Sequence, residues 1–329
     1  MAEKPPLSYD ELLARTDAPA RSTWGLYGPD DEVGMLNVLG PDDVVAAAGL
    51  IRRGAVFNLD LSLDAFDPHF AARRRAPTHT MFESMSHHLD DYLDGFYLQG
   101  TSQIDSLRHI VHPDHGFYNG HDAAAIKPGS PTLGINRWAE RGIVGRGVLL
   151  DVDRYLTSVG DPLDQRSGRS FGVEVLEATA AAQGVELGLG DLLLLRTGWL
   201  RWALHDVPVE QRAEMGGWDR PGIEQSDELV RWLWEHQVPL LAADNVAIEA
   251  IPVAPDTPFL AGGEAPGRTH GMFHKVAIPL LGMALGELWD MEALAEDCGA
   301  DGVWEFLLVA KPLYVNGGVG TPANALAIK

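Results

Sequence analysis

The chain contains 329 residues, of which 46% are hydrophobic, and it carries a formal net charge of −22 at pH 7. Such an acidic protein is poorly suited to binding nucleic acids through their phosphates or to docking on an anionic membrane. The only cysteine, Cys298, excludes an intramolecular disulfide and a cysteine-ligated zinc site, and neither a secretory signal nor an apolar run of membrane-spanning length is evident, so we expect a cytoplasmic protein.

Segments typical of strands and of helices alternate along the chain without a clear linker. Strands are predicted at residues 56–63, 147–152, 192–195, 240–243 and 306–310. Helices are predicted at residues 41–51, closed by Gly54, at 171–183, ended by Gly184, and at 226–236, capped by Ser226. This alternation predicts an α/β protein, a single domain built on a mixed sheet.

Glycine and proline are concentrated at residues 252–268, which predicts a long loop. Long loops inside compact domains usually carry function, and this loop runs directly into His270 and His274. The other histidines, at 87, 88, 112, 115 and 121, lie in turn-like segments and are expected at the surface.

Residues 97–109 form the most informative stretch of the chain. Gln99, Thr101, Gln103 and Asp105 alternate along it and would share one face of a strand. Polar side chains aligned in this way need partners, such as a metal ion, water or a polar substrate. His109, four residues after Asp105, can turn back toward the same point. The alternative is an edge strand with a solvated face.

This stretch resembles the metal-binding signature of the cyclase family, which includes bacterial kynurenine formamidase and isatin hydrolase. The signature is His-x-Gly-Thr-His-x-Asp-x-Pro-x-His. Aligned on Asp105 and His109, its two leading histidines fall on Gln99 and Gln103, and its proline falls on Leu107. A longer branch of the family resembles this chain more closely, with glutamines at these places.

Further motifs follow the order found in that branch, so the resemblance extends from about residue 22 to the C-terminus. They include Thr23-Trp24-Gly25, residues 118–120 (Tyr-Asn-Gly), Asp244-Asn245 with Glu249, and residues 317–322. The resemblance implies the swivelling β/β/α fold of the family over residues 22–329, preceded by an N-terminal extension at residues 1–21.

A second part of the site is predicted between His274 and Glu287. Residues 274–281 are expected to form a helix that Gly282 ends, followed by a short strand that ends at Glu287. Such a returning strand can bring Glu287 beside His274, and the resemblance implies that this pair completes a metal site. The alternatives are a helix-start histidine with local hydrogen bonds and a solvated glutamate.

The candidate metal ligands are therefore Asp105, Gln103, Gln99, His274 and Glu287. With few imidazoles and no thiolate, this set is a poorer zinc site than the His/His/Asp set of the family. Oxygen-rich ligation favours Mn²⁺ or Mg²⁺, although zinc, a single ion or a metal-free site stay open.

The resemblance implies a metal-dependent hydrolase that cleaves an amide, formamide, lactam or lactone in a small cyclic or aromatic molecule, acting on carbon–nitrogen bonds other than peptide bonds. His109 would act as the base, with Asp105 and Glu287 as the other catalytic groups. Trp24, Tyr118 and Asn119 are candidate substrate-binding residues, although Trp24 can equally be a core side chain. The alternatives are a metal-dependent cyclase or dehydratase and a catalytically silent binding protein.

A homo-oligomer, most simply a dimer with its site near the subunit interface, is also expected. The resemblance suggests it, and so do large aromatic side chains in loop-like segments. These are Phe66, Phe70, Phe82, Trp218 and Phe259. The alternative is that these rings pack into the protein's own core.

Overall fold

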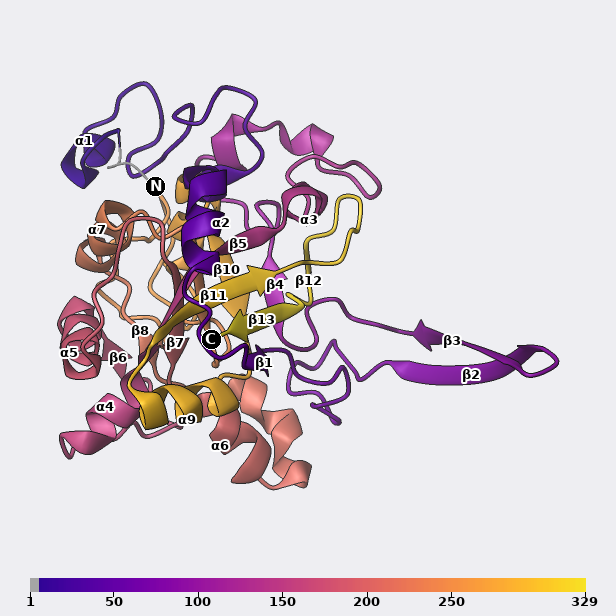
Figure 1. The fold of residues 1–329 in the computed structure, drawn as a ribbon. Helices are drawn as coiled ribbons and strands as arrows, with labels where there is room; N and C mark the ends of the chain where they lie inside the picture. Colours follow the sequence, from indigo (N-terminus) through magenta and orange to yellow (C-terminus); the bar gives the residue numbers. More distant parts are fainter. Residues whose placement is uncertain (1–5) are drawn as a thin grey trace.

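The computed structural model describes residues 6–329 and is organised around one large mixed sheet (Figure 1). Its strand order is β1-β13-β11-β5-β7-β9-β10-β4-β12. The bounds are β1 (Val56–Asn58), β4 (Gln103–Asp105), β5 (Ile143–Asp151), β7 (Leu192–Arg196), β9 (Leu240–Ala243), β10 (Ala284–Glu287), β11 (Glu305–Ala310), β12 (Gly320–Thr321) and β13 (Ala325–Ile328). The α/β class, the single domain and the mixed sheet are thus as predicted.

The centre of the sheet is parallel and its two sides are antiparallel. β5, β7, β9 and β10 run parallel, whereas β4 pairs antiparallel with β10 and β12, and β11 with β5 and β13. Every residue of β7 and β9 is buried, as expected for continuous apolar runs covered on both faces. β5 begins four residues before the predicted start, and β1 is shorter than predicted because its pairing with β13 ends at Asn58.

Helices and short helical turns surround this sheet (Figure 1). The α-helices are α1 (Tyr9–Leu13), α2 (Pro41–Ala48), α3 (Asn136–Arg141), α4 (Val152–Ser158), α5 (Val173–Gln183), α6 (Trp199–His205), α7 (Asp227–Glu235), α8 (His274–Val276) and α9 (Glu292–Asp301). The turns are η1 (Gly34–Val38), η2 (Tyr118–Gly120), η3 (Ala123–Ala125), η4 (Val209–Gly217) and the π-helical η5 (Ala277–Leu281).

The predicted helix ends are set by their capping residues. α5 stops at Gly184, which adopts φ 67°, and the Ser226 hydroxyl accepts a hydrogen bond from Leu229 N at 3.0 Å at the start of α7. α2 ends at Gly49 rather than close to Gly54. No helix within residues 6–329 is long and apolar enough to cross a membrane.

The N-terminal segment packs on α7. The first five residues of the predicted extension lie outside the described part of the chain. From residue 6 onward, Tyr9 donates a hydrogen bond to Asp227 at 2.6 Å and Arg21 forms an ion pair with the same carboxylate. The segment therefore contacts the domain that it precedes.

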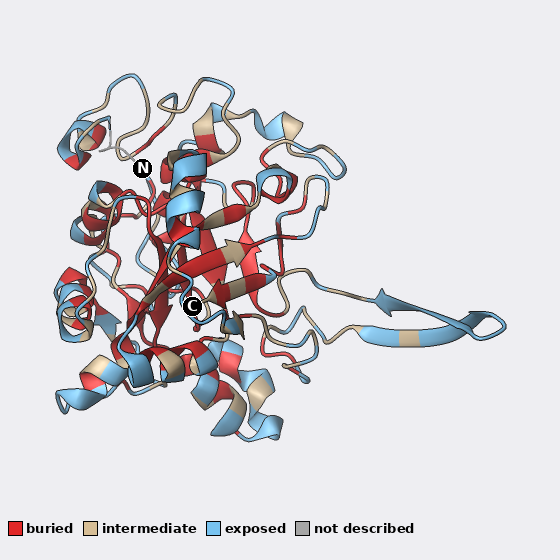
Figure 2. Cartoon of the chain, in the orientation of Figure 1, coloured by how far each residue is buried: buried red, intermediate tan, exposed pale blue. Residues whose placement is uncertain are grey.

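A long hairpin projects from the body of the protein. It consists of β2 (Thr78–Met85) and β3 (His88–Asp94), and nearly all of it is exposed (Figures 1 and 2). The predicted surface positions of His87 and His88 are confirmed, although the segment is a hairpin turn rather than an irregular loop. A smaller pair, β6 (Ser170–Phe171) with β8 (Gly222–Ile223), lies apart from the main sheet.

Several rings predicted at the surface are instead buried in the chain itself. Phe66, Phe70 and Phe259 are buried, Trp218 is half-buried, and only Phe82, on the hairpin, is exposed. His112 is also buried rather than exposed, with its ring stacked on His115. Most of the aromatic side chains that suggested an oligomer interface are therefore buried in the protein's own core.

Candidate metal centre and adjoining cleft

Two carboxylates meet where β4 and β10 lie side by side. Leu285 is paired with Asp105, and Glu287 is paired with Gln103. Residues directly opposite each other in an antiparallel pair share a face of the sheet, as do residues two apart in one strand. Asp105, Gln103 and Glu287 therefore share one face, as the polar alternation along residues 99–105 predicts.

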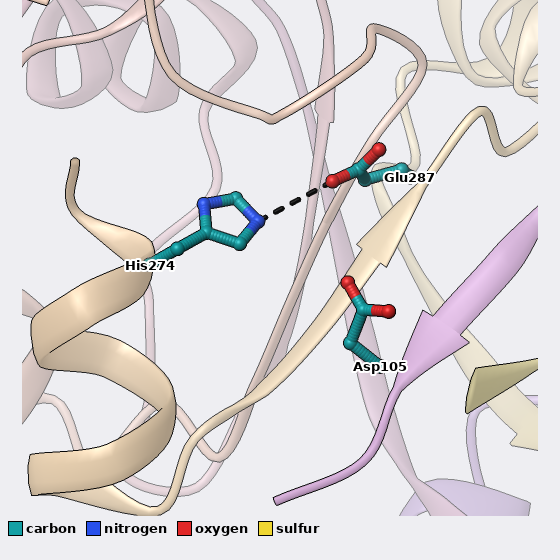
Figure 3. Close-up of side chains that lie close together, drawn as sticks. All are labelled: Asp105, His274 and Glu287. Atoms are coloured by element: carbon teal, nitrogen blue, oxygen red, sulfur yellow. Dashed lines mark ion pairs between the residues drawn. The ribbon is translucent and has the colours of Figure 1, made fainter. Parts of the chain in front are cut away.

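His274 reaches the same point from α8. Gly282, with φ 70°, ends the helical segment and lets the chain return through β10. The His274 ring lies between two carboxylates. Its Nδ1 is 2.7 Å from Glu249 Oε1. Its Nε2 is 3.3 Å from Glu287 Oε1 (Figure 3). The predicted meeting of His274 with Glu287 is thus present in the structure.

Glu249 is the partner of His274 that the sequence did not assign to the site. It is fully buried, and its other oxygen accepts hydrogen bonds from Phe273 N at 2.7 Å and from Gln225 Nε2 at 2.9 Å. These donors hold the carboxylate in place against Nδ1. Burial alone would lower the pKa of His274, but the hydrogen bonds and charges of Glu249 and Glu287 outweigh it and raise that pKa to about 10.

The two carboxylates differ in what surrounds them. Burial raises the pKa of Asp105, and the nearby charge of Glu287 adds to this effect. Burial also acts to raise the pKa of Glu287, but the hydrogen bond from His274 prevails and lowers it. These pKa directions favour a protonated His274 beside an ionised Glu287.

The donor set fits a divalent cation. Asp105, His274 and Glu287 each offer a ligand atom, and the three atoms lie within 4.8 Å of one another (Figure 3). Glu249 engages Nδ1 and leaves Nε2 available, which is the usual arrangement around a metal-ligating histidine. A cation would take the place of the proton that Nε2 now shares with Glu287.

Gln99 and Gln103 lie beside this set with their amide nitrogens toward Asp105. Gln99 Nε2 is 2.5 Å from Asp105 Oδ1, and Gln103 Nε2 is 3.5 Å from Oδ2. In this orientation they orient the carboxylate. Gln103 Oε1 is buried and has no hydrogen-bond partner, so one oxygen next to the cluster is free to bind an ion or a substrate.

His109 lies next to Asp105 and can be reached from solvent. Its Nε2 is 3.8 Å from Asp105 Oδ2, its Nδ1 is 3.2 Å from Gln99 Nε2, and its side chain is 27% exposed. Gln99 Nε2 faces Nδ1 as a donor, which assigns the ring proton to Nε2.

A cleft of about 650 Å³ opens beside the cluster. Gln99, Gln103, His109 and Glu287 line it together with Arg73, Arg74 and Arg220. Its volume is in the range of small-molecule sites. The arginines are functional candidates that the sequence did not single out.

The structure places Trp24, Tyr118 and Asn119 outside this cleft. Trp24 Nε1 donates to Pro279 O at 2.7 Å, and the fully buried Tyr118 donates to Asp31 at 2.9 Å. Asn119 accepts from Gly25 N and donates to Gly28 O. These residues hold the segment after Ser22 against η2 and η5, and the half-buried Trp24 packs against the core.

Comparison with known proteins identifies the family. A family model described as a putative cyclase matches residues 59–250. The chain belongs to this cyclase family. A crystal structure described as a novel cyclase is 34% identical, covers 94% of this chain and 99% of its own, and superposes with a TM-score of 0.79.

More distant solved structures share the fold. Isatin hydrolase A from Ralstonia solanacearum is 17% identical, with a TM-score of 0.53 and coverage of 86% of this chain and 94% of its own. An isatin hydrolase bound to the product analogue thioisatinate gives 14% identity, a TM-score of 0.53 and coverage of 88% and 98%. A search of curated proteins finds no significant match. The predicted cyclase-family fold is confirmed.

Proposed function

We propose that the protein is a metal-dependent hydrolase that cleaves an amide, formamide, lactam or lactone bond in a small cyclic or aromatic molecule. The observation that carries the proposal is the convergence of Asp105, His274 and Glu287 beside a cleft of small-molecule size. Membership of the cyclase family and the hydrolase names of structural neighbours support the same reaction class.

The ligands of the ion would be Asp105, Glu287 and His274 Nε2, with Gln103 Oε1 as the nearest additional oxygen. Two carboxylates and one imidazole form an oxygen-rich set, which suits Mn²⁺ or Mg²⁺ better than a zinc site with several imidazoles would. Zinc is the third candidate. A bound divalent ion supplies a Lewis acid that polarises a carbonyl and makes water more acidic.

His109 would move the proton of the attacking water. To accept it at Nε2, the ring must carry its own proton on Nδ1, and Gln99 must then present Oε1 to that proton. Rotating the amide by half a turn exchanges Oε1 and Nε2 with almost no change in shape. A bound cation shared with Asp105 would remove the need for the Gln99 Nε2 contact to Oδ1.

Metal content and product analysis test the proposal together. The protein is purified without chelator or added metal, its metal is quantified, and it is screened against aryl formamides, cyclic imides, lactams and lactones. We expect bound metal in the wild type, its loss in Asp105→Asn and Glu287→Gln, and its retention in Asp64→Asn, which alters an exposed carboxylate.

The products decide between the reaction classes. Metal-dependent addition of water to one substrate class supports the hydrolase. Metal with dehydration or ring closure assigns the protein to the lyases. Absence of both metal and turnover leaves a binding protein of the same fold.

A further inference from the structure

The cleft next to the metal centre is rich in positive charge, although the chain is strongly acidic. Three arginines line it, Arg73, Arg74 and Arg220, whereas Glu287 is the one carboxylate among its lining residues in the described chain. Glu287 already interacts with His274. In a protein of net charge −22, three arginines gathered at one cleft indicate selection for an anion.

Arg220 is the best-positioned of the three. Its side chain is buried, with the residue 6% exposed, and its backbone is fixed by two hydrogen bonds with Ile251, at 2.8 and 3.0 Å. One terminal nitrogen makes only long contacts, to Gly216 O at 3.3 Å and Trp218 O at 3.5 Å. Its Nε has no partner, and Arg220 forms no ion pair within 4.0 Å of any described carboxylate, although the charges of Glu287 and Asp219 act on it from farther away.

Hydrogen bonds within the protein do not account for this arrangement. Arg108 is also buried without a carboxylate partner, but it donates to Ser130 O at 2.9 Å, Gly317 O at 2.7 Å and Lys127 O at 3.1 Å. Asp219, the acidic neighbour of Arg220 in sequence, pairs with Arg268. A buried guanidinium with an unused donor is costly, so a partner from outside the chain is expected.

We propose that Arg220 binds a carboxylate group of the substrate, with Arg74 and Arg73 in the same cleft adding favourable charge. A guanidinium binds a carboxylate through two parallel N–H donors, and the unpartnered Nε provides one of them. The inference rests on the proposed hydrolase and narrows it: the substrate is a small molecule with a free carboxylate in addition to the bond that is cleaved.

Gln103 is a second residue that a substrate in this cleft could contact. Its Oε1 is the second buried polar atom without a partner among the residues lining the cleft. The Gln103 oxygen is an acceptor and Arg220 is a donor, so together they suit a ligand that carries a donor group beside its carboxylate. The charge of Glu287 acts on Arg220, so this carboxylate would bind close to the metal centre.

Binding of two probes that contain no hydrolysable bond tests the inference. 2-Naphthoate and its neutral methyl ketone, 2-acetylnaphthalene, have nearly the same shape and differ in charge. Their affinities are measured by calorimetry for wild type, Arg220→Gln, Arg220→Lys and Arg75→Gln. Arg75 lies in the same segment as Arg73 and Arg74 but does not line the cleft.

We expect wild type to bind the carboxylate roughly 10- to 100-fold more tightly than the ketone, the range expected for hydrogen bonds to a charged group. Arg220→Gln should lose this preference, Arg220→Lys should keep part of it, and Arg75→Gln should match wild type. If near-ultraviolet circular dichroism shows that Arg220→Gln is misfolded, the Arg220→Lys variant tests the inference instead. Full retention of the carboxylate preference in Arg220→Lys would overturn the two-donor contact.

Two further outcomes would overturn the inference. One is equal affinity for both probes in wild type. The other is a preference that survives in Arg220→Gln but disappears when metal is removed with a chelator, which would assign the carboxylate to the ion. Tighter binding of phenyl phosphate, lost in Arg220→Gln, would replace the carboxylate by a phosphate. Because no probe is hydrolysed, a positive result stands even if the hydrolysis screen fails.

Discussion

Glu249 holds His274 by its Nδ1 atom, at 2.7 Å, while the opposite ring nitrogen faces Glu287. The two residues are 25 positions apart, and both are buried. The histidine therefore has a fixed ring orientation before any ion binds. Orientation of this kind is what makes a single imidazole effective in an otherwise oxygen-rich site.

Replacing Glu249 by glutamine should weaken metal binding without unfolding the protein. The amide has the same shape, but it lacks the charge that stabilises the Nδ1–H donor. Changes at such positions typically lower metal affinity by about 10- to 100-fold. Competition with a chromophoric chelator measures the effect, with Glu228→Gln, an exposed residue at the start of α7, as the matched control. Unchanged affinity would contradict the orienting role.

Asp105 and His109 should both be required for activity, while the fold survives their loss. Asp105→Ala removes a ligand carboxylate, and His109→Ala removes the proton acceptor, which costs roughly 10²- to 10⁴-fold in rate. Turnover of a confirmed substrate and circular dichroism are measured on the same samples. Near-normal turnover in either variant would refute the assignment of that residue.

Gln103→His should strengthen zinc binding. Gln103 shares a face with Glu287 beside the metal centre, and imidazole nitrogen is a better zinc ligand than a carboxamide oxygen. Zinc affinity is measured by chelator competition. Thr101→His, two residues earlier in the chain, is the comparison variant. A variant at 103 that binds zinc no better than wild type would count against Gln103 facing the ion.

Local signals in the sequence explain how much of this site could be predicted. The alternation of Gln103 and Asp105 and the helix end at Gly282 depend on neighbouring residues, so the strand face and the return to Glu287 follow from them. Arg220 gave no such signal, and Glu249 stood out only as part of a family motif without a role, because both roles depend on contacts between segments distant in sequence. Trp24 was ambiguous for the same reason: an aromatic side chain suits a pocket and a core equally.

Acid should destabilise the protein partly through His112. Burial lowers the pKa of this histidine from 6.5 to about 4, and its Nδ1 accepts a hydrogen bond from Asp114 N at 3.1 Å. Because the folded state disfavours the protonated ring, this contribution to stability is full above pH 6.5 and is lost as the pH falls toward 4. At about 1.4 kcal/mol per pKa unit, it amounts to at most about 3.5 kcal/mol.

The variant His112→Asn keeps an acceptor and removes the titration. Urea unfolding is measured for both proteins near neutral pH and about two pH units lower. We expect the wild type to lose more stability than the variant over this interval, since other groups contribute equally to both. An identical loss would show that folding does not lower the pKa of His112.

The projecting hairpin leads to the last prediction, a homodimer. It carries apolar side chains on both faces, and an isolated two-stranded hairpin is only marginally stable in water. One face presents Phe82 and Tyr92, and the other presents Met81, Leu89 and Leu93, all between 42% and 65% exposed. A second copy of the chain is the partner expected to cover them, because two-fold association buries the same surface on both subunits.

The hairpin also connects two of the segments that line the cleft. It begins shortly after Arg74 and ends shortly before Gln99, so a partner that covers the hairpin would also approach the mouth of the site. Light scattering after size exclusion should give twice the chain mass of 35.7 kDa at micromolar concentration. Phe82→Asp and Leu89→Asp should shift the protein toward monomer, whereas Val159→Asp, at an exposed position after α4, should not. A mass of one chain at every wild-type concentration would rule out the dimer.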